Sequence, residues 1–255
     1  MSGTSHPMIN GSALDIGGTR ARLYYFEGAA VRNRSEISLP PRQGGEEEAA
    51  WGSRRVQAIA DLVGEWAGPC PGGRIPTACA GRKDERRESV VLSFYASTLP
   101  DLVPLVKART GRDLGPLLDD DVCAGWGHQA AGHLDESESG TIVLTAGTGV
   151  AESLWRDGAF LPKGSFPRLS DLGLEDALRA EAWRGGELPL EALARLVVAR
   201  REQGEFSRLL LSGRFAQRDD WPATLEGVEL QVRALDEAPA LGALAQSPAR
   251  GQATP

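Results

Sequence analysis

The chain has 255 residues, of which 41% are hydrophobic and 25% are charged, a composition typical of a globular protein. Its formal net charge of −7 argues against nucleic acid as the main partner, because nucleic-acid-binding surfaces are basic. The three cysteines and three histidines form neither a disulfide framework nor a metal-ligand pattern. No segment approaches the ~20 apolar residues of a membrane span, and no apolar signal segment precedes residue 12. We therefore expect a reduced, cytoplasmic protein that binds no membrane.

Short apolar strands and amphipathic helices alternate through the first half of the chain. A glycine turn at 17–19 is expected to join the first two strands into a hairpin, and Gly111 to end a helix. A run of mixed charge at 81–88 is typical of a solvated helix face or loop. The expected elements are strands at 12–17, 21–26, 31–39, 74–80 and 114–118, and helices at 46–66, 101–110 and 122–131.

The second half is expected to be mostly helical. Asp157-Gly158 favours a tight hairpin turn, because it supplies the positive φ that such a turn needs. The expected helices lie at 172–183, 188–201 and 239–246, and the expected strands at 141–145, 150–155, 159–161, 206–211 and 228–232.

A strand followed by a glycine turn occurs twice, and each occurrence is a candidate phosphate-binding motif. The two segments are Asp15-Ile16-Gly17-Gly18-Thr19 and Thr145-Ala146-Gly147-Thr148-Gly149. Without a Cβ, successive backbone N–H groups in such a turn can surround an anion. Asp15 is suited to hold Mg²⁺ through water, because hard cations prefer oxygen ligands. The plain alternative is a hairpin turn, but a nucleotide bound between two lobes needs a cradle from each side.

Three consecutive acids, Asp119-Asp120-Asp121, follow an expected strand and open an expected helix. Aspartate is a favoured helix cap, so at least one of them is expected to serve only that purpose. The functional interpretation is that one carboxylate acts as general base on an alcohol during phosphoryl transfer.

Ser212-Gly213-Arg214 follows the apolar strand at 206–211. Small residues at this turn would let an adenine ring lie against the backbone. An ordinary turn between a strand and a helix is an equally good interpretation of this segment alone.

In this order, these segments resemble the ROK sugar kinases over most of the chain, from Ala13 to Ala243. Asp15 to Thr19 is similar to the first phosphate motif of that family, 147–149 to the second, and 212–214 to the adenosine motif. The segment Asp119 to His128 aligns without gaps on the family's Asn-Asp-Ala-Asn…Gly-Glu segment. This alignment places Asp120 on the catalytic aspartate and Asp119 on a sugar-binding asparagine.

The resemblance implies an α/β, two-lobed ribonuclease-H-like fold of the actin/hexokinase type with a central cleft. The lobes would be residues 1–118 and 119–255, with the terminal helix able to return to the first. It implies phosphorylation of a sugar-like alcohol by ATP and Mg²⁺, with lobe closure excluding water, and is compatible with a homodimer.

The chain departs from the ROK pattern in three places. The family has a Glu-x-x-His pair that binds sugar hydroxyls; here Asp171 takes the place of the Glu, and Leu174 replaces the His. The cysteine-rich zinc loop is missing, so no structural zinc is expected. The second phosphate motif continues with Val150-Ala151-Glu152, where the family has further glycines. These departures concern mainly the sugar-binding half.

Two functions of other classes are compatible with the same residues. One is an ATPase or activator subunit of the same superfold, and the other is a pseudokinase that binds nucleotide without transfer. A repressor-type regulator is disfavoured, because no helix-turn-helix precedes Asp15.

Overall fold

The computed structural model describes residues 10–247, apart from 71–72, 93–96, 116, 135–139, 148, 163, 180–181 and 183–185. The chain forms two compact units. The first comprises residues 1–131 and 237–255, and the second comprises residues 132–236. Each unit is built on its own β-sheet.

The first unit contains a five-stranded sheet in the order β3-β2-β1-β4-β8. Its strands are β1 (Asn10–Ile16), β2 (Arg20–Glu27), β3 (Ala30–Ser38), β4 (Thr77–Cys79) and β8 (Leu117–Asp119). The first three are an antiparallel meander, whereas β4 and β8 run parallel to β1. In register, Ile16 lies beside Cys79 and Cys79 beside Asp119. The carboxyl ends of the parallel strands therefore lie level at one edge.

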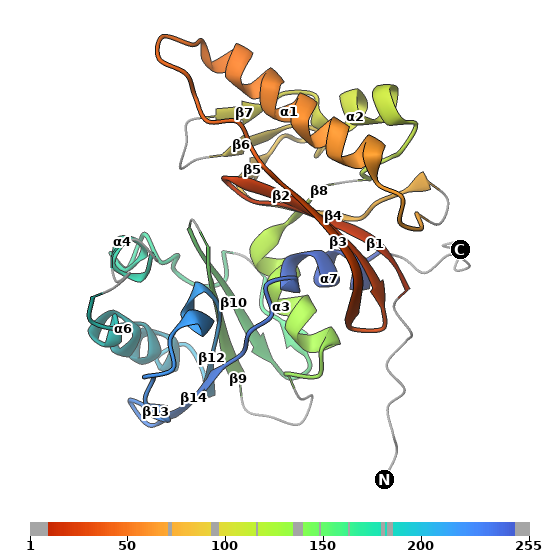
Figure 1. Cartoon of the computed structure of the whole chain (residues 1–255). Coiled ribbons are helices and arrows are strands. Elements are labelled where there is room, and N and C mark those ends of the chain that lie inside the picture. Colours follow the sequence, from red (N-terminus) through yellow and green to blue (C-terminus); the bar gives the residue numbers. More distant parts are fainter. Residues whose placement is uncertain are drawn as a thin grey trace. The chain divides into compact units, whose positions relative to one another are not determined.

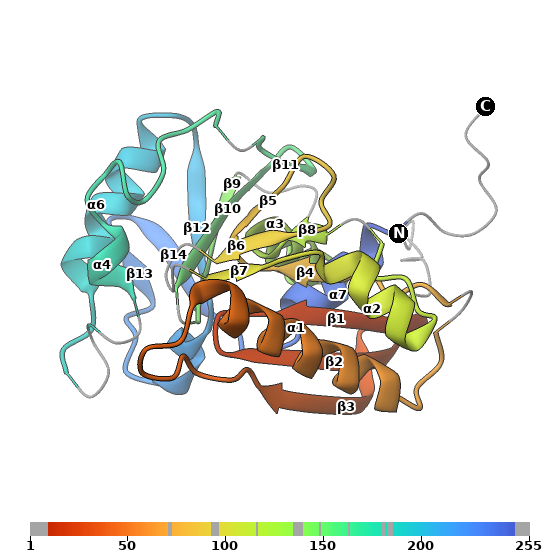
Figure 2. The ribbon, with the colours of Figure 1, turned by 90° about the horizontal axis from the view of Figure 1, so that it is seen from above.

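Helices cover both faces of this sheet (Figures 1 and 2). On one face, α1 (Glu48–Glu65) and α2 (Leu102–Thr110) bury their apolar residues against Leu14, Ile16 and Leu23. On the other face lie α3 (Asp120–Ala130) and α7 (Ala238–Ala245), whose small residues pack on β1, β2 and β4. Gly111 ends α2 with a φ of +71°, as expected.

The division between the units falls after Ala131 rather than after Leu118, because α3 packs closely on α7. A Cβ on Gly242 would lie 1.7 Å from the carbonyl oxygen of Cys123. A Cβ on Gly127 would lie 2.0 Å from that of Ala238. Glycine at both positions therefore lets the two helix backbones touch, and α7 completes the first unit.

A second, three-stranded sheet in the first unit consists of β5 (Arg82–Lys83), β6 (Val90–Leu92) and β7 (Ser97–Leu99). The expectation of a solvated helix face or loop at 81–88 is wrong where β5 forms. The side chain of Lys83 is only 5% exposed, because acceptors surround its ammonium group.

The second unit is built on a six-stranded sheet in the order β11-β10-β9-β12-β14-β13. Its strands are β9 (Gly140–Ala146), β10 (Val150–Arg156), β11 (Ala159–Phe160), β12 (Phe206–Gly213), β13 (Thr224–Leu225) and β14 (Val228–Val232). The expectation of a mostly helical second half is therefore wrong. The helix expected at 172–183 is interrupted, because α4 (Glu175–Leu178) ends before an extended residue at Arg179, and Ala182 is helical again. The helix α6 (Leu190–Arg201) is close to its expected place.

A buried ion pair anchors α6 to the sheet of the second unit. The guanidinium of Arg200 donates from Nε and Nη2 to the two carboxylate oxygens of Glu152, both at 2.7 Å. Arg200 also donates to the carbonyl of Pro167. Glu152, which follows the second glycine turn, thus has a structural partner. The β10–β11 hairpin turns at Asp157 and Gly158, both at positive φ, as expected.

Within the described residues, no helix combines the length and apolar character needed to cross a lipid bilayer.

Candidate functional site

The first glycine turn links β1 to β2 at the edge where the parallel strands end. The Gly17 N–H donates to the Arg20 carbonyl at 2.9 Å, which closes the hairpin. The Gly17 N–H is therefore not available to an anion, and the predicted cradle consists of the N–H groups of Gly18 and Thr19. Thr19 is exposed.

Arg55, a residue of α1, forms a hydrogen bond to this turn. Its guanidinium donates to the carbonyl of Gly18 and lies 5.1 Å from the ring centre of Trp51, one helical turn earlier. The residue is 1% exposed. Sequence analysis missed it, because Arg55 lies among the apolar residues of α1 without any motif of its own.

The fold itself does not require glycine at two of the motif positions. A Cβ on Gly17 would meet the Arg20 carbonyl at an ordinary 3.5 Å, and one on Gly147 would meet nothing within 4 Å. Neither residue has a positive φ. The absence of a side chain there leaves room that a ligand could use. Gly213 differs, because its φ is +65° and a Cβ would lie 2.3 Å from the carbonyl oxygen of Ala146.

Asp15 is almost fully buried, at 6% exposure, beside the first turn. Its Oδ2 lies 3.3 Å from Nη1 of Arg22, which is directly opposite on β2. Burial raises the pKa of Asp15 to about 7, with Arg22 opposing the rise and the negative charge of Asp120 adding to it. Asp15 and Asp120 therefore act on each other electrostatically.

These residues fit a divalent cation of the hard, oxygen-preferring kind. Burial and the negative charge of Asp120 both disfavour the charged form of Asp15, and a bound cation would offset that cost, even with Arg22 present. Among the described residues, no three His, Cys, Asp or Glu side chains gather to hold a metal by themselves. Mg²⁺ commonly uses only one or two carboxylates together with water and substrate phosphates.

The three consecutive acids have different surroundings. Asp119 Oδ1 accepts a hydrogen bond from the Lys83 ammonium at 2.8 Å. Asp121 Oδ1 accepts one from the Val122 N–H at 2.7 Å, which is a local helix-start role. Asp120 is half-buried, and its charge acts on Asp15 and on the thiols of Cys79 and Cys123. Asp120 thus lies near the first turn, and the adjacent Asp119 and Asp121 both accept hydrogen bonds from within the protein.

Lys83 is a residue of this site that sequence analysis missed. Its ammonium donates to the Cys79 and Gly81 carbonyls as well as to Asp119. In the sequence, Lys83 is only one lysine in a run of mixed charge. Its pairing with Asp119 could not be foreseen, because the two residues are 36 positions apart. The position that the ROK resemblance assigns to sugar binding is therefore a carboxylate fixed by a buried cation.

Lys83→Met is expected to destabilise the chain by about 1–3 kcal/mol, because it leaves a half-buried carboxylate without its cation. Lys107→Met is the matched control, because Lys107 is 61% exposed and lies 3.7 Å from Asp113. We expect the control to cost less than about 0.5 kcal/mol. Urea unfolding of both variants measures the difference, and equal midpoints would show that the Lys83–Asp119 pair contributes no stability.

In the second unit, the second glycine turn and the adenosine-like motif are at the same end of adjacent strands. Ser212 pairs with Thr145 in register, and their hydroxyl oxygens are 2.8 Å apart. Ser212 is fully buried, so its side chain holds the two strands together. The Gly147 N–H donates to the Gly149 carbonyl at 2.8 Å. Thr148 lies outside the described residues.

Arg214 begins the 3-10 helix η3 (Arg214–Gln217) directly after this turn. Its Nη1 is buried without a hydrogen-bond partner in the described part of the chain. Such a donor is costly to leave unpaired.

Asp171, the predicted counterpart of a sugar-binding glutamate, belongs to the second unit. It is exposed in the turn before α4, and its Oδ2 accepts a hydrogen bond from the Arg168 N–H at 2.9 Å. Leu174, at the family's histidine position, is buried in the apolar core.

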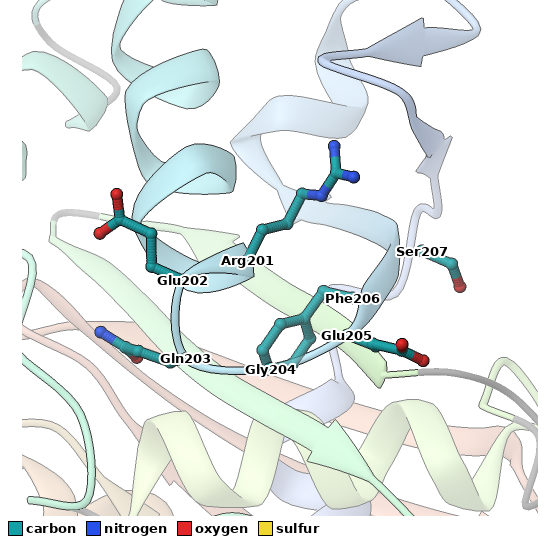
Figure 3. Close-up of a pocket in the computed structure, with 7 residues that line it drawn as sticks. All are labelled: Arg201, Glu202, Gln203, Gly204, Glu205, Phe206 and Ser207. Atoms are coloured by element: carbon teal, nitrogen blue, oxygen red, sulfur yellow. The ribbon is translucent and has the colours of Figure 1, made fainter.

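The second unit also carries an open hollow of about 670 Å³, between the end of α6 and the start of β12 (Figure 3). It is lined by the consecutive residues 201–207. The polar side chains point away from one another, with Glu202 and Gln203 on one side and Glu205 and Ser207 on the other. The hollow is at the opposite end of β12 from Ser212, so it is separate from the predicted nucleotide motifs.

Comparison by sequence finds no family model and no curated protein that matches this chain. By structure, the inorganic polyphosphate/ATP-glucomannokinase of Arthrobacter sp. strain KM matches with a TM-score of 0.70 at 19% identity, covering 92% of this chain and 96% of that one. A ROK family glucokinase from Streptomyces griseus, solved with glucose and AMPPNP, gives a TM-score of 0.60 at 15% identity, covering 92% and 98%. The chain has the fold of the ROK sugar kinases.

The ROK fold also occurs in a protein of another class. A ROK family transcriptional regulator, a homologue of the E. coli MLC protein, matches with a TM-score of 0.59 at 13% identity, covering 94% of this chain and 78% of that one. The predicted ROK-type α/β fold is confirmed, while activity has to be argued from the site. The central cleft and the roles of the individual residues stay predictions.

Proposed function

We propose that this chain transfers the terminal phosphoryl group of ATP to a hydroxyl of a sugar or sugar-like alcohol. The observation that supports this most is the position of Asp120. It is half-buried at the edge where the first glycine turn lies, and its charge acts on Asp15. The two flanking acids are engaged by Lys83 and by the Val122 N–H.

In the proposed reaction, Asp120 accepts the proton of the substrate hydroxyl as the alcohol oxygen attacks the γ-phosphorus. The new O–P bond forms while the bond between the γ-phosphorus and the β–γ bridging oxygen breaks, and ADP leaves. Asp15 would hold Mg²⁺ through water, and the ion supplies neutralisation of phosphate charge when bound. Asp119 and Asp171 would contact the sugar hydroxyls.

Each glycine turn would contribute to binding the phosphates, the first through Gly18 and Thr19 and the second through residues 147–149. The turn at Ser212-Gly213 would contact the adenosine through its backbone, with Arg214 Nη1 as an additional donor. Arg55 would position the first turn through its hydrogen bond to the Gly18 carbonyl.

Gly17→Ala and Gly147→Ala are expected to weaken MgATP binding by about tenfold or more while leaving the fold intact. The added methyl group meets only ordinary contacts or open space in the protein, but it occupies the approach to the phosphates. Calorimetric titration with MgATP measures the effect, with Gly44→Ala as the control, because a Cβ there also meets nothing within 4 Å. Unchanged affinity in both motif variants would contradict a role for the turns in phosphate binding.

The function is tested by ADP release with a panel of hexoses, amino sugars and N-acyl amino sugars. Release that depends on one of these acceptors is the expected result. Release independent of any acceptor would instead indicate an ATPase or activator subunit. MgATP binding without ADP release would indicate a pseudokinase.

One observation favours the pseudokinase as the second candidate. Asp15 and Asp119, which the resemblance assigns to the metal and the sugar, each form an ion pair within the protein, with Arg22 and Lys83. A carboxylate that is already paired within the protein is less available to a metal ion or to a sugar hydroxyl. The acceptor panel distinguishes the two candidates directly.

A further inference from the structure

The guanidinium of Arg22 forms an ion pair with Asp15, the carboxylate of the first phosphate motif that is predicted to hold a cation. Asp15, Arg22 and Glu36 are direct neighbours in the register of the adjacent strands β1, β2 and β3. Arg22 Nη1 lies 3.3 Å from Asp15 Oδ2, and Arg22 Nε lies 3.1 Å from Glu36 Oε2. The side chain of Arg22 thus bridges a buried carboxylate, Asp15, and a more open one, Glu36, whose side chain is 26% exposed.

Glu36 receives two further arginines. Arg20 Nη1 lies 3.2 Å from Glu36 Oε1, and Arg34 Nη2 contacts Glu36 Oε2. Three guanidiniums therefore share one carboxylate, whose two oxygens provide about four acceptor positions. Arg22 is held between this crowded carboxylate and Asp15.

A divalent cation and a guanidinium compete for the same carboxylate, because both use the lone pairs of its oxygens. Their positive charges also repel each other. We propose that Arg22 sets the divalent-cation affinity of the first phosphate motif by competing for Asp15, and that Glu36 retains Arg22 when the cation binds. The inference rests on the proposed role of Asp15 as the Mg²⁺ ligand. It adds a residue outside the glycine motif that controls metal loading.

The test is a titration with Mn²⁺ alone, followed by the electron paramagnetic resonance signal of the free ion. Arg22→Gln is expected to bind Mn²⁺ at least about tenfold more tightly than the unmodified protein, because the competing charge is gone. Glu36→Gln is expected to bind it more weakly, because Arg22 then has only Asp15. Arg32→Gln is the matched control: Arg32, on β3, pairs one-to-one with Glu27 at 2.9 Å.

The added affinity must come from Asp15 itself. The double variant Arg22→Gln with Asp15→Asn is therefore expected to lose the gain. Persistence of the gain in the double variant would overturn the proposal, and so would an Arg22→Gln affinity no higher than that of Arg32→Gln. Urea unfolding identifies a variant that has lost its fold. Arg22→Lys, which keeps the charge but cannot bridge two carboxylates in the same way, then replaces Arg22→Gln and is expected to show a smaller gain.

This measurement is independent of phosphoryl transfer, because it uses neither nucleotide nor sugar. A chain that phosphorylates no sugar, yet gains Mn²⁺ affinity in Arg22→Gln, would keep this inference and lose the proposed function. If the protein phosphorylates a sugar but Arg22→Gln leaves its Mn²⁺ affinity unchanged, the proposed function stands and the role of Arg22 is wrong.

Discussion

Asp120→Asn is expected to lower sugar-dependent turnover by about 10²–10⁴-fold, the usual cost of losing a general base. Asparagine keeps the size of the side chain and can still accept a hydrogen bond, but it cannot take the proton from the substrate hydroxyl. Because Asp120 is expected to contact the acceptor and not the nucleotide, MgATP affinity should change little. Initial rates and calorimetric MgATP titration, measured on the same protein sample, separate the two effects.

Asp121→Asn is the control for this prediction. Asp121 accepts a hydrogen bond from the Val122 N–H, and asparagine can accept the same bond. The expected cost is little activity and less than about 1 kcal/mol of stability. Near-normal turnover by Asp120→Asn, on a sugar that the unmodified protein phosphorylates, would contradict the assignment of Asp120 as the base.

Gly242→Ala is expected to destabilise the first unit by about 3 kcal/mol or more, the upper end of the cost of overpacking. The added Cβ would lie 1.7 Å from the Cys123 carbonyl oxygen and 2.8 Å from the Gly127 nitrogen. Both are backbone atoms of α3, so no side chain can move aside, and the helices have to separate. Urea unfolding of the full chain measures the loss.

Gly64→Ala is the matched control, because Gly64 is also a helical glycine. A Cβ there would meet Thr110 Cγ2 at an ordinary 3.6 Å. We expect this variant to be as stable as the unmodified chain or more stable by up to about 1 kcal/mol, because alanine favours the helix. If both variants unfold at the same urea concentration, the close contact between α3 and α7 does not stabilise the fold.

The elements with strong local patterns were predictable from sequence. The β1–β2 hairpin, α1 and the β10–β11 turn have apolar periodicity or glycine turns that act over a few residues. The order of the motifs also predicted the ROK fold, which the structural neighbours confirm. Sequence failed where tertiary packing decides. The stretch at 172–183 has a helical apolar pattern and was predicted as one helix, yet α4 ends at Leu178 and Arg179 is extended.

The charged residues of the candidate site were the least predictable part. Lys83 looked solvated because nothing local shows that Asp119 lies beside it. Arg22 looked like an ordinary strand residue, because its opposition to Asp15 depends on strand register. Gly213 stays a predicted ligand contact, and its φ and the nearby Ala146 backbone show that the fold itself also requires glycine there. Sequence identifies candidate groups, and only the register and packing show which of them are already paired.

Phosphorus-31 NMR of a single reaction shows whether a sugar receives the phosphoryl group. The unmodified protein is incubated with MgATP and the acceptor that gives the greatest ADP release. We expect a new sugar-phosphate resonance that grows in step with ADP, with no matching growth of inorganic phosphate. Inorganic phosphate formed in step with ADP, or ATP left unchanged with every acceptor of the panel, would show that the protein does not phosphorylate a sugar.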